Sequence, residues 1–182
     1  MSKTEVLDRL LDAFRDKGYE GASLSELSAA TGLPKASLYH YFPGGKEEMA
    51  HHVMAHHDQR LAKSLFEPLR SSESPEKKLT AMLDTIDAFY EGGRKACLLE
   101  RMCTAAERDR FRRPLRRGFA AFVEAVEQLC IEAGLSRALA RARAEDFLVR
   151  VEGALVMCAG TGDYGVFART LKDLRRSVLA RS

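Results

Sequence analysis

The sequence predicts an all-helical protein. Apolar residues recur every three to four positions along nearly the whole chain, strand-like alternation is almost absent, and glycine and proline separate the periodic segments. At 182 residues the chain can bury a sizeable core in one domain or two small ones. We expect nine helices: three in an N-terminal helix-turn-helix domain at residues 1–46, and six in a bundle at residues 47–182.

The first predicted helix ends near Gly18. Its apolar stripe repeats at helical spacing and consists of Val6, Leu7, Leu10, Leu11 and Phe14. A glycine at this point readily ends a helix, because it adopts backbone angles that other residues avoid.

Two short helices joined by a tight turn are predicted next. Ser23 and Glu26 have the spacing of a capping box, so a helix should begin directly after Ser23. Gly32 can supply the positive φ that ends this helix. Pro34 lacks an N–H and has a preset φ, which suits the start of a second helix near Lys35.

The second short helix should have one inward and one outward face. Leu38 and Phe42 lie four residues apart and are expected to point inward. The residues turned outward are Lys35, Ala36, Ser37, Tyr39 and His40. This set suits a recognition helix, because small residues let the backbone approach base edges while Lys, Tyr and His reach bases and phosphates.

Six further helices are expected after this turn. Glycine and proline mark their ends, residues 70–74 form the best linker, and Ser74 followed by Pro75 is typical of a helix start. The expected segments are 46–68, 75–91, 96–108, 115–134, 136–159 and 164–179.

Composition restricts the possible classes only weakly. The net charge of +3 is small, and residues 1–46 carry six basic and six acidic side chains, so charge alone does not indicate DNA binding. Because no run of eighteen apolar residues or secretory leader is present, we expect a cytoplasmic protein with no membrane partner. The four cysteines have no C-x-x-C spacing and are expected to be reduced.

The N-terminal segment resembles the TetR (tetracycline repressor) family of bacterial transcription regulators. The matching motifs, in the family's order and spacing over roughly the first fifty residues, are Phe14-x-x-x-Gly18-Tyr19-x-x-Ala22-Ser23-Leu24, Ala29-x-x-Gly32-Leu33, Leu38-Tyr39-His40-Tyr41-Phe42 and Lys46-Glu47-Glu48. The turn Pro43-Gly44-Gly45-Lys46 is one residue longer than the family's commonest form. With Glu152-Gly153-Ala154-Leu155 near the end, the chain looks like the branch that responds to flavonoids and lincomycin-type compounds.

The resemblance implies a homodimer that binds a near-palindromic operator in double-stranded DNA. By this resemblance, Lys35 and Ser37 touch base edges and Ala36 permits their close approach. The phosphates would be contacted by Tyr39, His40, Tyr41 and Lys46. The alternative is that the aromatic residues are core of a three-helix unit, which we favour for Phe42 alone.

The last two helices would form the dimer interface. The residues expected to contribute are Phe147, Val151, Leu155, Phe167, Leu171 and Leu174. Dimerisation would fix the separation of the two recognition helices.

The resemblance also implies a cavity in the bundle for a small hydrophobic or aromatic effector that releases a repressor from DNA. The expected lining residues are Phe89, Met102, Phe122, Phe147 and Val151, with Arg101 or Glu152 as a polar anchor. The same apolar side chains can equally be ordinary core. Repression is the family's commoner mode, and no residue separates a repressor from an activator.

Three other interpretations stay open. Cys97 follows two basic residues near a helix start, which favours the thiolate, so Cys97 or Cys103 could sense redox state. Glu48 and the histidines of residues 51–57 could share a zinc face, although a solvated face is favoured. The arginine-rich run at residues 108–117 could attract DNA phosphates or an anionic ligand, or be a solvated junction.

A helical-bundle enzyme is a further alternative. The sequence has no P-loop, no G-x-S-x-G, no H-E-x-x-H and no paired Glu-x-x-His motif. We therefore predict no catalytic residue, no cofactor and no metal.

Overall fold

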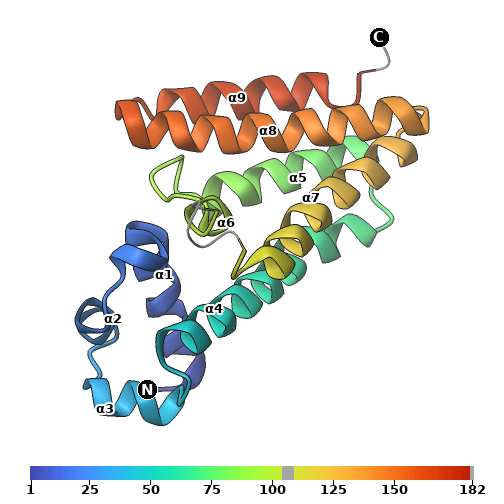
Figure 1. Cartoon of the computed structure of the whole chain (residues 1–182). Helices are drawn as coiled ribbons and strands as arrows, with labels where there is room; N and C mark the ends of the chain where they lie inside the picture. The colour runs from blue at the N-terminus through green and yellow to red at the C-terminus, as the bar shows by residue number, and fades with distance from the viewer. Residues whose placement is uncertain (104–108, 181–182) are drawn as a thin grey trace. The chain divides into compact units, whose positions relative to one another are not determined.

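The computed structural model describes residues 1–103 and 109–180. All regular structure in these ranges is helical, which confirms the all-α fold class (Figure 1). Across the described ranges the elements are α1 (Lys3–Gly21), α2 (Leu24–Thr31), α3 (Lys35–Tyr41), α4 (Gly45–Leu61), the π-helical η1 (Ala62–Phe66), the 3-10 helix η2 (Glu67–Arg70), α5 (Pro75–Phe89), α6 (Leu98–Arg101), α7 (Arg112–Glu132), α8 (Arg137–Thr161) and α9 (Gly165–Ser177). None of the described helices combines the length and apolar character that a membrane span requires.

The chain folds into two compact units, each with its own core. The first unit comprises residues 1–60 and 98–116, and the second comprises residues 61–97 and 117–182. In the first unit the fully buried side chains include Val6, Leu10, Phe14, Leu27, Leu38, Phe42, Met49 and Val53. In the second they include Leu83, Ile86, Val126, Phe147, Phe167 and Leu174. The functional division at residue 46 stays a prediction, since α4 as far as Arg60 groups structurally with the first three helices.

Serine caps begin α5 and α8 where the sequence predicts them. The Ser74 hydroxyl accepts a hydrogen bond from the Lys77 N–H at 3.4 Å, and the Ser136 hydroxyl accepts one from the Leu139 N–H at 3.3 Å. Each cap satisfies a backbone donor that has no partner within the first helical turn.

The long fourth helix that we predicted does not stay α-helical to Pro68. It ends at Leu61 and continues as η1 and η2. Pro68 has no N–H and its ring crowds the carbonyl of Ser64, four residues earlier, so the backbone widens before it. The expected linker at residues 70–74 follows directly, as a bend from 71 to 73.

The sixth helix is much shorter than predicted. Within the described residues it spans only Leu98–Arg101, and the Cys103 N–H then donates to the Glu100 carbonyl at 2.9 Å, a tight turn that ends it. Residues 104–108 of the predicted helix lie outside the described residues.

Helices α8 and α9 pack antiparallel against each other, and α9 also packs against α5 (Figure 1). This packing buries all six side chains that we expected at a dimer interface: Phe147, Val151, Leu155, Phe167, Leu171 and Leu174. That assignment was wrong, because the stripes of the two helices cover each other within one chain. The exposed large apolar residues of α8 are instead Val149, Val156 and Met157.

Candidate nucleic-acid interface

Helix α2 is fixed at its start by the predicted capping box. The Ser23 hydroxyl accepts from the Glu26 N–H at 3.3 Å, and the Ser23 N–H donates to Glu26 Oε2 at 2.8 Å. Lys17 lies 2.9 Å from Glu26 Oε1. This ammonium, and then the Ser23 backbone and hydroxyl, lower the pKa of Glu26 to about 2, so the cap stays ionised at any ordinary pH.

Side-chain hydrogen bonds hold the end of α2 and the turn itself. The Ser28 hydroxyl donates to the Leu33 carbonyl at 2.6 Å, and the buried Thr31 hydroxyl donates to the Leu27 carbonyl at 2.8 Å. Arg9 of α1 donates to the Thr31 carbonyl at 2.9 Å, and Gly32 has the predicted positive φ of 71°. These hydrogen bonds hold the turn in place, because they satisfy carbonyl groups at the end of α2.

Helix α3 presents the predicted outward face. Leu38 and Phe42 are fully buried, whereas Lys35, Ala36 and His40 are exposed. Tyr39 is 44% exposed, and Ser37 and Tyr41 are partly exposed. The hydroxyl of Tyr41 donates to the Met1 carbonyl at 3.4 Å. All six of the α3 residues that we singled out are therefore fully or partly exposed, while Leu38 points into the core of the unit.

The seventh of these residues, Lys46, lies in the first turn of α4. Gly45 before it has φ of 69°, and a β-carbon placed there would come within 3.4 Å of Tyr39 Cε1. The Gly44 N–H donates to Glu48 Oε2 at 2.6 Å, which caps the start of the helix. Two glycines thus turn the chain sharply and bring the Tyr39 ring next to the start of α4, where cationic and backbone donors favour an anion.

The predicted effector residues are dispersed. Phe89 and Phe122 line one narrow internal space that has no room for a water molecule. Phe147 and Val151 are buried in α8, and Met102 is buried in the first unit. The structure therefore brings together two of the five residues, and the assignment stays a prediction.

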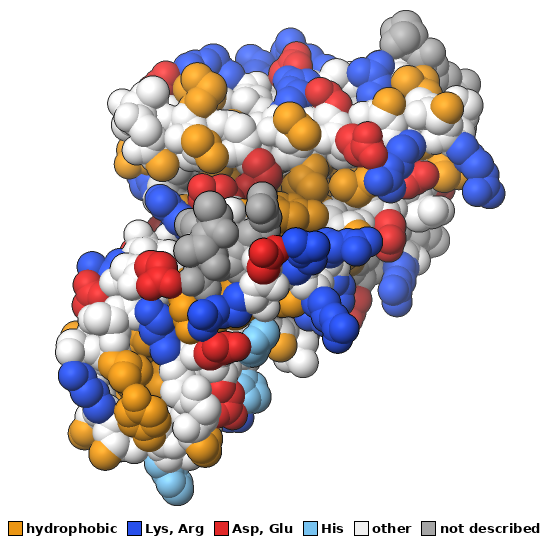
Figure 2. Space-filling view, in the orientation of Figure 1, with side chains coloured by type: hydrophobic (Ala, Val, Ile, Leu, Met, Phe, Trp, Pro, Cys, Tyr) orange, Lys and Arg blue, Asp and Glu red, His pale blue; other side chains and the backbone are white. Residues whose placement is uncertain are grey.

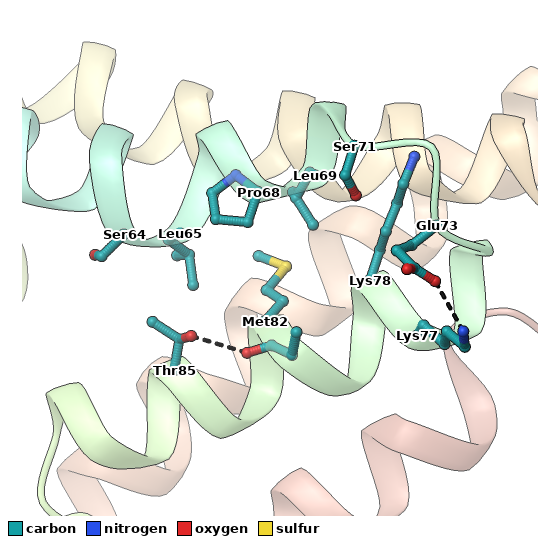
Figure 3. Close-up of a pocket in the computed structure, with 11 residues that line it drawn as sticks. Ser64, Leu65, Pro68, Leu69, Ser71, Glu73, Lys77, Lys78, Met82 and Thr85 are labelled. Atoms are coloured by element: carbon teal, nitrogen blue, oxygen red, sulfur yellow. Dashed lines mark hydrogen bonds and ion pairs between the residues drawn. The ribbon is translucent and has the colours of Figure 1, made fainter.

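Two roomier cavities lie in the second unit. One, of about 310 Å³, has η1 and η2 on one side and α5 on the other; Figure 3 shows Leu65, Pro68 and Leu69 facing Met82 across it. The second, of about 360 Å³, is lined by Leu69, Arg70 and the side of α7 from Ala121 to Glu132. Both have the volume of a small-molecule site.

The histidines of α4 do not assemble a metal site. His52 lies 3.6 Å from Glu48, His56 lies 2.8 Å from Asp8, and His57 is buried, so the three rings face different surroundings. Within residues 1–103 and 109–180 no three His, Cys, Asp or Glu side chains are grouped for a metal ion.

Sequence reasoning missed part of the first unit. Arg110 and Phe111 pack on Tyr19, a contact that joins residues about ninety positions apart. The arginine-rich run is evident in the sequence, but no local pattern shows which element such a segment packs against.

Comparison with known proteins agrees with this geometry. Residues 6–53 match the model of the N-terminal domain of the bacterial regulatory proteins of the tetR family. The transcriptional regulator LmrA of Bacillus subtilis is 26% identical over 89 residues, which cover 49% of this chain and 47% of LmrA. The uncharacterised regulator YxaF of the same organism is 41% identical over 49 residues, covering 27% of this chain and 26% of YxaF. The matched part of the chain thus spans about half or less of the length of each of these relatives.

The fold matches over nearly the whole chain. The crystal structure of a TetR transcriptional regulator from Legionella pneumophila superposes with a TM-score of 0.86 at 20% identity, covering 97% of this chain and 98% of that one. Residues 6–53 therefore match a TetR-family N-terminal domain, and the chain shares its helical fold with this solved TetR regulator.

Proposed function

We propose that the protein is a homodimeric transcription regulator of the cytoplasm, and not an enzyme. In this proposal each copy places its α3 in the major groove of a near-palindromic operator. The observation that carries this proposal is the exposed face of Lys35, Ala36, Tyr39 and His40 on a helix whose turn is locked by side-chain hydrogen bonds. A fixed helix with small and basic outward residues suits direct readout of bases.

The proposed dimer uses the exposed apolar strip of α8. Val149 is 69% exposed, Val156 is 51% exposed and Met157 is 52% exposed. Gly153 and Gly160 lie on the same side, and a β-carbon on either would meet nothing within 4 Å. A second copy can therefore approach this backbone closely, as in a two-fold four-helix interface. Figure 2 shows hydrophobic atoms at the surface along the α8–α9 layer.

The proposed effector is a small hydrophobic or aromatic molecule bound in the second unit, as for the branch that responds to flavonoids and lincomycin-type compounds. The cavity between η1–η2 and α5 has apolar walls from Leu65, Leu69 and Met82, with the hydroxyl of Thr85 at its edge (Figure 3). An effector that prefers the DNA-incompetent state about 100-fold would supply roughly 2.7 kcal/mol of coupling. Release by an effector is the behaviour of a repressor.

Selection of duplexes from a random pool tests the DNA-binding proposal. The purified chain should enrich a near-palindromic site with half-sites about one helical turn apart, roughly 34–36 Å. The selected duplex then serves for affinity measurements, with Lys77→Ala as a control that removes an exposed cation from the second unit. Failure to enrich any sequence over random duplex would contradict the proposal.

The dimer is tested by sedimentation. Val149→Asp with Val156→Asp should give a monomer that binds a full operator far more weakly, because each apolar contact is replaced by a charge. Ala120→Asp, at an exposed site on α7, is the control and should stay dimeric. An unchanged mass for the double variant would exclude this face.

Titration of flavonoids and lincomycin-type compounds into the protein–operator complex tests the effector proposal. Release of DNA by any of them supports it. If none releases DNA, the second unit serves for dimerisation and the ligand-responsive part of the proposal fails.

A further inference from the structure

Two cations from distant parts of the chain share one buried aromatic ring in the first unit. Tyr19 is 6% exposed; Lys46 Nζ lies 4.4 Å from its ring centroid and Arg110 Cζ lies 5.3 Å from it. Arg110 also donates to the Tyr19 hydroxyl at 3.2 Å and to Glu47 Oε2 at 2.8 Å. We call Tyr19, Lys46, Glu47, Arg110 and Phe111 the Tyr19 cluster.

Phe111 anchors the distant segment on the same helices. Its ring is fully buried and meets the Tyr19 ring edge-on, with centroids 5.1 Å apart. It meets the His51 ring of α4 in the same way at 5.2 Å. The pair Arg110–Phe111 therefore contacts the end of α1 and the first two turns of α4 at once.

This segment continues directly into a helix that belongs to both units. The chain passes between the units after Arg60, after Cys97 and after Arg116. The last passage lies inside α7, whose first residue is Arg112. Arg110 lies two residues before the start of this helix.

We propose that Arg110 is a positioning residue for DNA binding. Through Glu47 and Tyr19 it fixes the first turn of α4, and so sets where Lys46 presents its charge to a phosphate. It also neutralises Glu47, a carboxylate adjacent in sequence to Lys46 that would otherwise oppose an anion or capture the lysine. This inference rests on the proposed function, in which Lys46 is a phosphate contact.

The solvent exposure of the Arg110–Glu47 ion pair indicates whether removal of Arg110 should change folding stability or DNA affinity. The side chains of Arg110 and Glu47 are 41% and 52% exposed, and ion pairs this exposed contribute little to folding stability. Removal of Arg110 should therefore leave the fold intact and alter DNA affinity. A defect in affinity without a defect in thermal unfolding is the expected signature of positioning.

The chain offers a matched control in the same arginine-rich run. Arg113 is exposed, and its guanidinium makes no hydrogen bond or ion pair within the described part of the chain. Arg113→Ala removes the same charge three residues from Arg110. It therefore reports any general electrostatic attraction to DNA that the run provides.

The experiment measures operator affinity of full-length variants by fluorescence anisotropy, with thermal unfolding followed in parallel. Arg110→Ala should weaken binding by about 5-fold or more, equivalent to roughly 1 kcal/mol, and Arg113→Ala by less than about 2-fold. Arg110→Lys, which keeps the charge but loses the planar fork, should restore part of the affinity. In the Arg110→Ala background, Lys46→Ala should cost less than in the wild type, because the two residues act together.

Three results would overturn the inference. Equal losses of operator affinity for Arg110→Ala and Arg113→Ala would show that Arg110 contributes only a general electrostatic attraction to DNA. Additive effects of Arg110→Ala and Lys46→Ala would show that the two residues act separately. If Lys46→Ala is silent in the wild type, the phosphate contact itself fails and the inference fails with it; the first two results leave the proposed function standing.

Discussion

The Tyr39 ring lies next to Gly45, with its Cε1 atom 3.4 Å from the position that a β-carbon on this residue would take. Tyr39 belongs to the candidate recognition helix and Gly45 to the start of α4. The glycine therefore does two things: it adopts a positive φ that turns the chain, and it leaves room for a ring that we expect to contact DNA.

Gly45→Ala should destabilise the first unit by about 1 kcal/mol, because alanine is strained at a φ of 69°. It should also weaken operator binding, because the strained turn lies between Tyr39 and Lys46, two of the expected DNA contacts. Chemical denaturation and anisotropy measure the two effects. The control is Gly21→Ala at the helical end of α1, where φ is not positive; equal stability of both variants would contradict this role.

Tyr39→Ala and Lys35→Ala should affect DNA binding in different ways. The first should weaken binding to all sequences by about 1 kcal/mol, and the second should relax base preference at one operator position. Affinities for a set of operators with single base changes separate the two outcomes. Identical specificity profiles for wild type and Lys35→Ala would remove Lys35 from the base-contacting set.

The ion pair between Lys78 and Glu132 should respond asymmetrically to mutation. The Lys78 side chain is 3% exposed and its ammonium lies 2.7 Å from Glu132 Oε1, whereas Glu132 is 49% exposed. Glu132→Ala leaves a buried ammonium without its carboxylate and should cost about 1–2 kcal/mol of unfolding free energy, less than for a fully buried pair. Lys78→Met should stay within about 1 kcal/mol of the wild type. Urea unfolding measures the loss of unfolding free energy in each variant. A larger loss for Lys78→Met than for Glu132→Ala would contradict this prediction.

The stability of the first unit should fall on mild acidification because of His57. Burial, and to a smaller degree the charges of Arg15 and Arg60, lower its pKa below 6.5, while the neighbouring Asp58 opposes this shift. The unfolded chain therefore binds a proton at a pH where the folded chain does not. The stabilisation is complete above pH 6.5 and is lost progressively as the pH falls below 6.5 toward the lowered pKa.

His57→Gln should make this loss of stability smaller. The measurement is the difference in unfolding free energy between variant and wild type from pH 7.5 to 5. A difference that does not change with pH would show that His57 titrates alike in both states.

The cysteines should differ sharply in reactivity. Cys103 is exposed, whereas Cys97, Cys130 and Cys158 are buried, and burial raises the pKa of the Cys130 thiol to about 11. One equivalent of iodoacetamide should therefore react with the native protein near neutral pH, at Cys103. If the alkylated protein still releases DNA on effector addition, redox sensing through Cys103 is excluded. Loss of DNA binding on oxidation of the alkylated protein would favour sensing through Cys97.

The parts of the fold that could be predicted from sequence are those encoded within a few residues. The caps at Ser23, Ser74 and Ser136 need a partner only three positions away, and the turn at Gly32 needs only a positive φ. The outward face of α3 follows from the four-residue spacing of Leu38 and Phe42. These local signals are sufficient to build most of the candidate interface.

The sequence-based predictions that failed, and the contacts that were missed, mostly depend on residues far apart in the sequence. Periodicity showed that Phe147 and Phe167 face inward, but it could not show that α9 of the same chain, rather than a second copy, covers α8. The same limit hid the packing of Arg110 on Tyr19, because nothing near either residue encodes the contact. The change from α- to π-helical geometry before Pro68 could not be predicted either. It depends on how several preceding residues adjust their backbone angles to relieve the steric clash of the proline ring.

Sedimentation of the purified chain with a selected operator duplex shows whether the protein binds a specific site as a dimer. The measurement is made at roughly 0.15 M salt, where nonspecific attraction to phosphates is screened. We expect two chains on one near-palindromic duplex, with clear preference over a scrambled duplex of equal length. A monomer that binds both duplexes equally would contradict it.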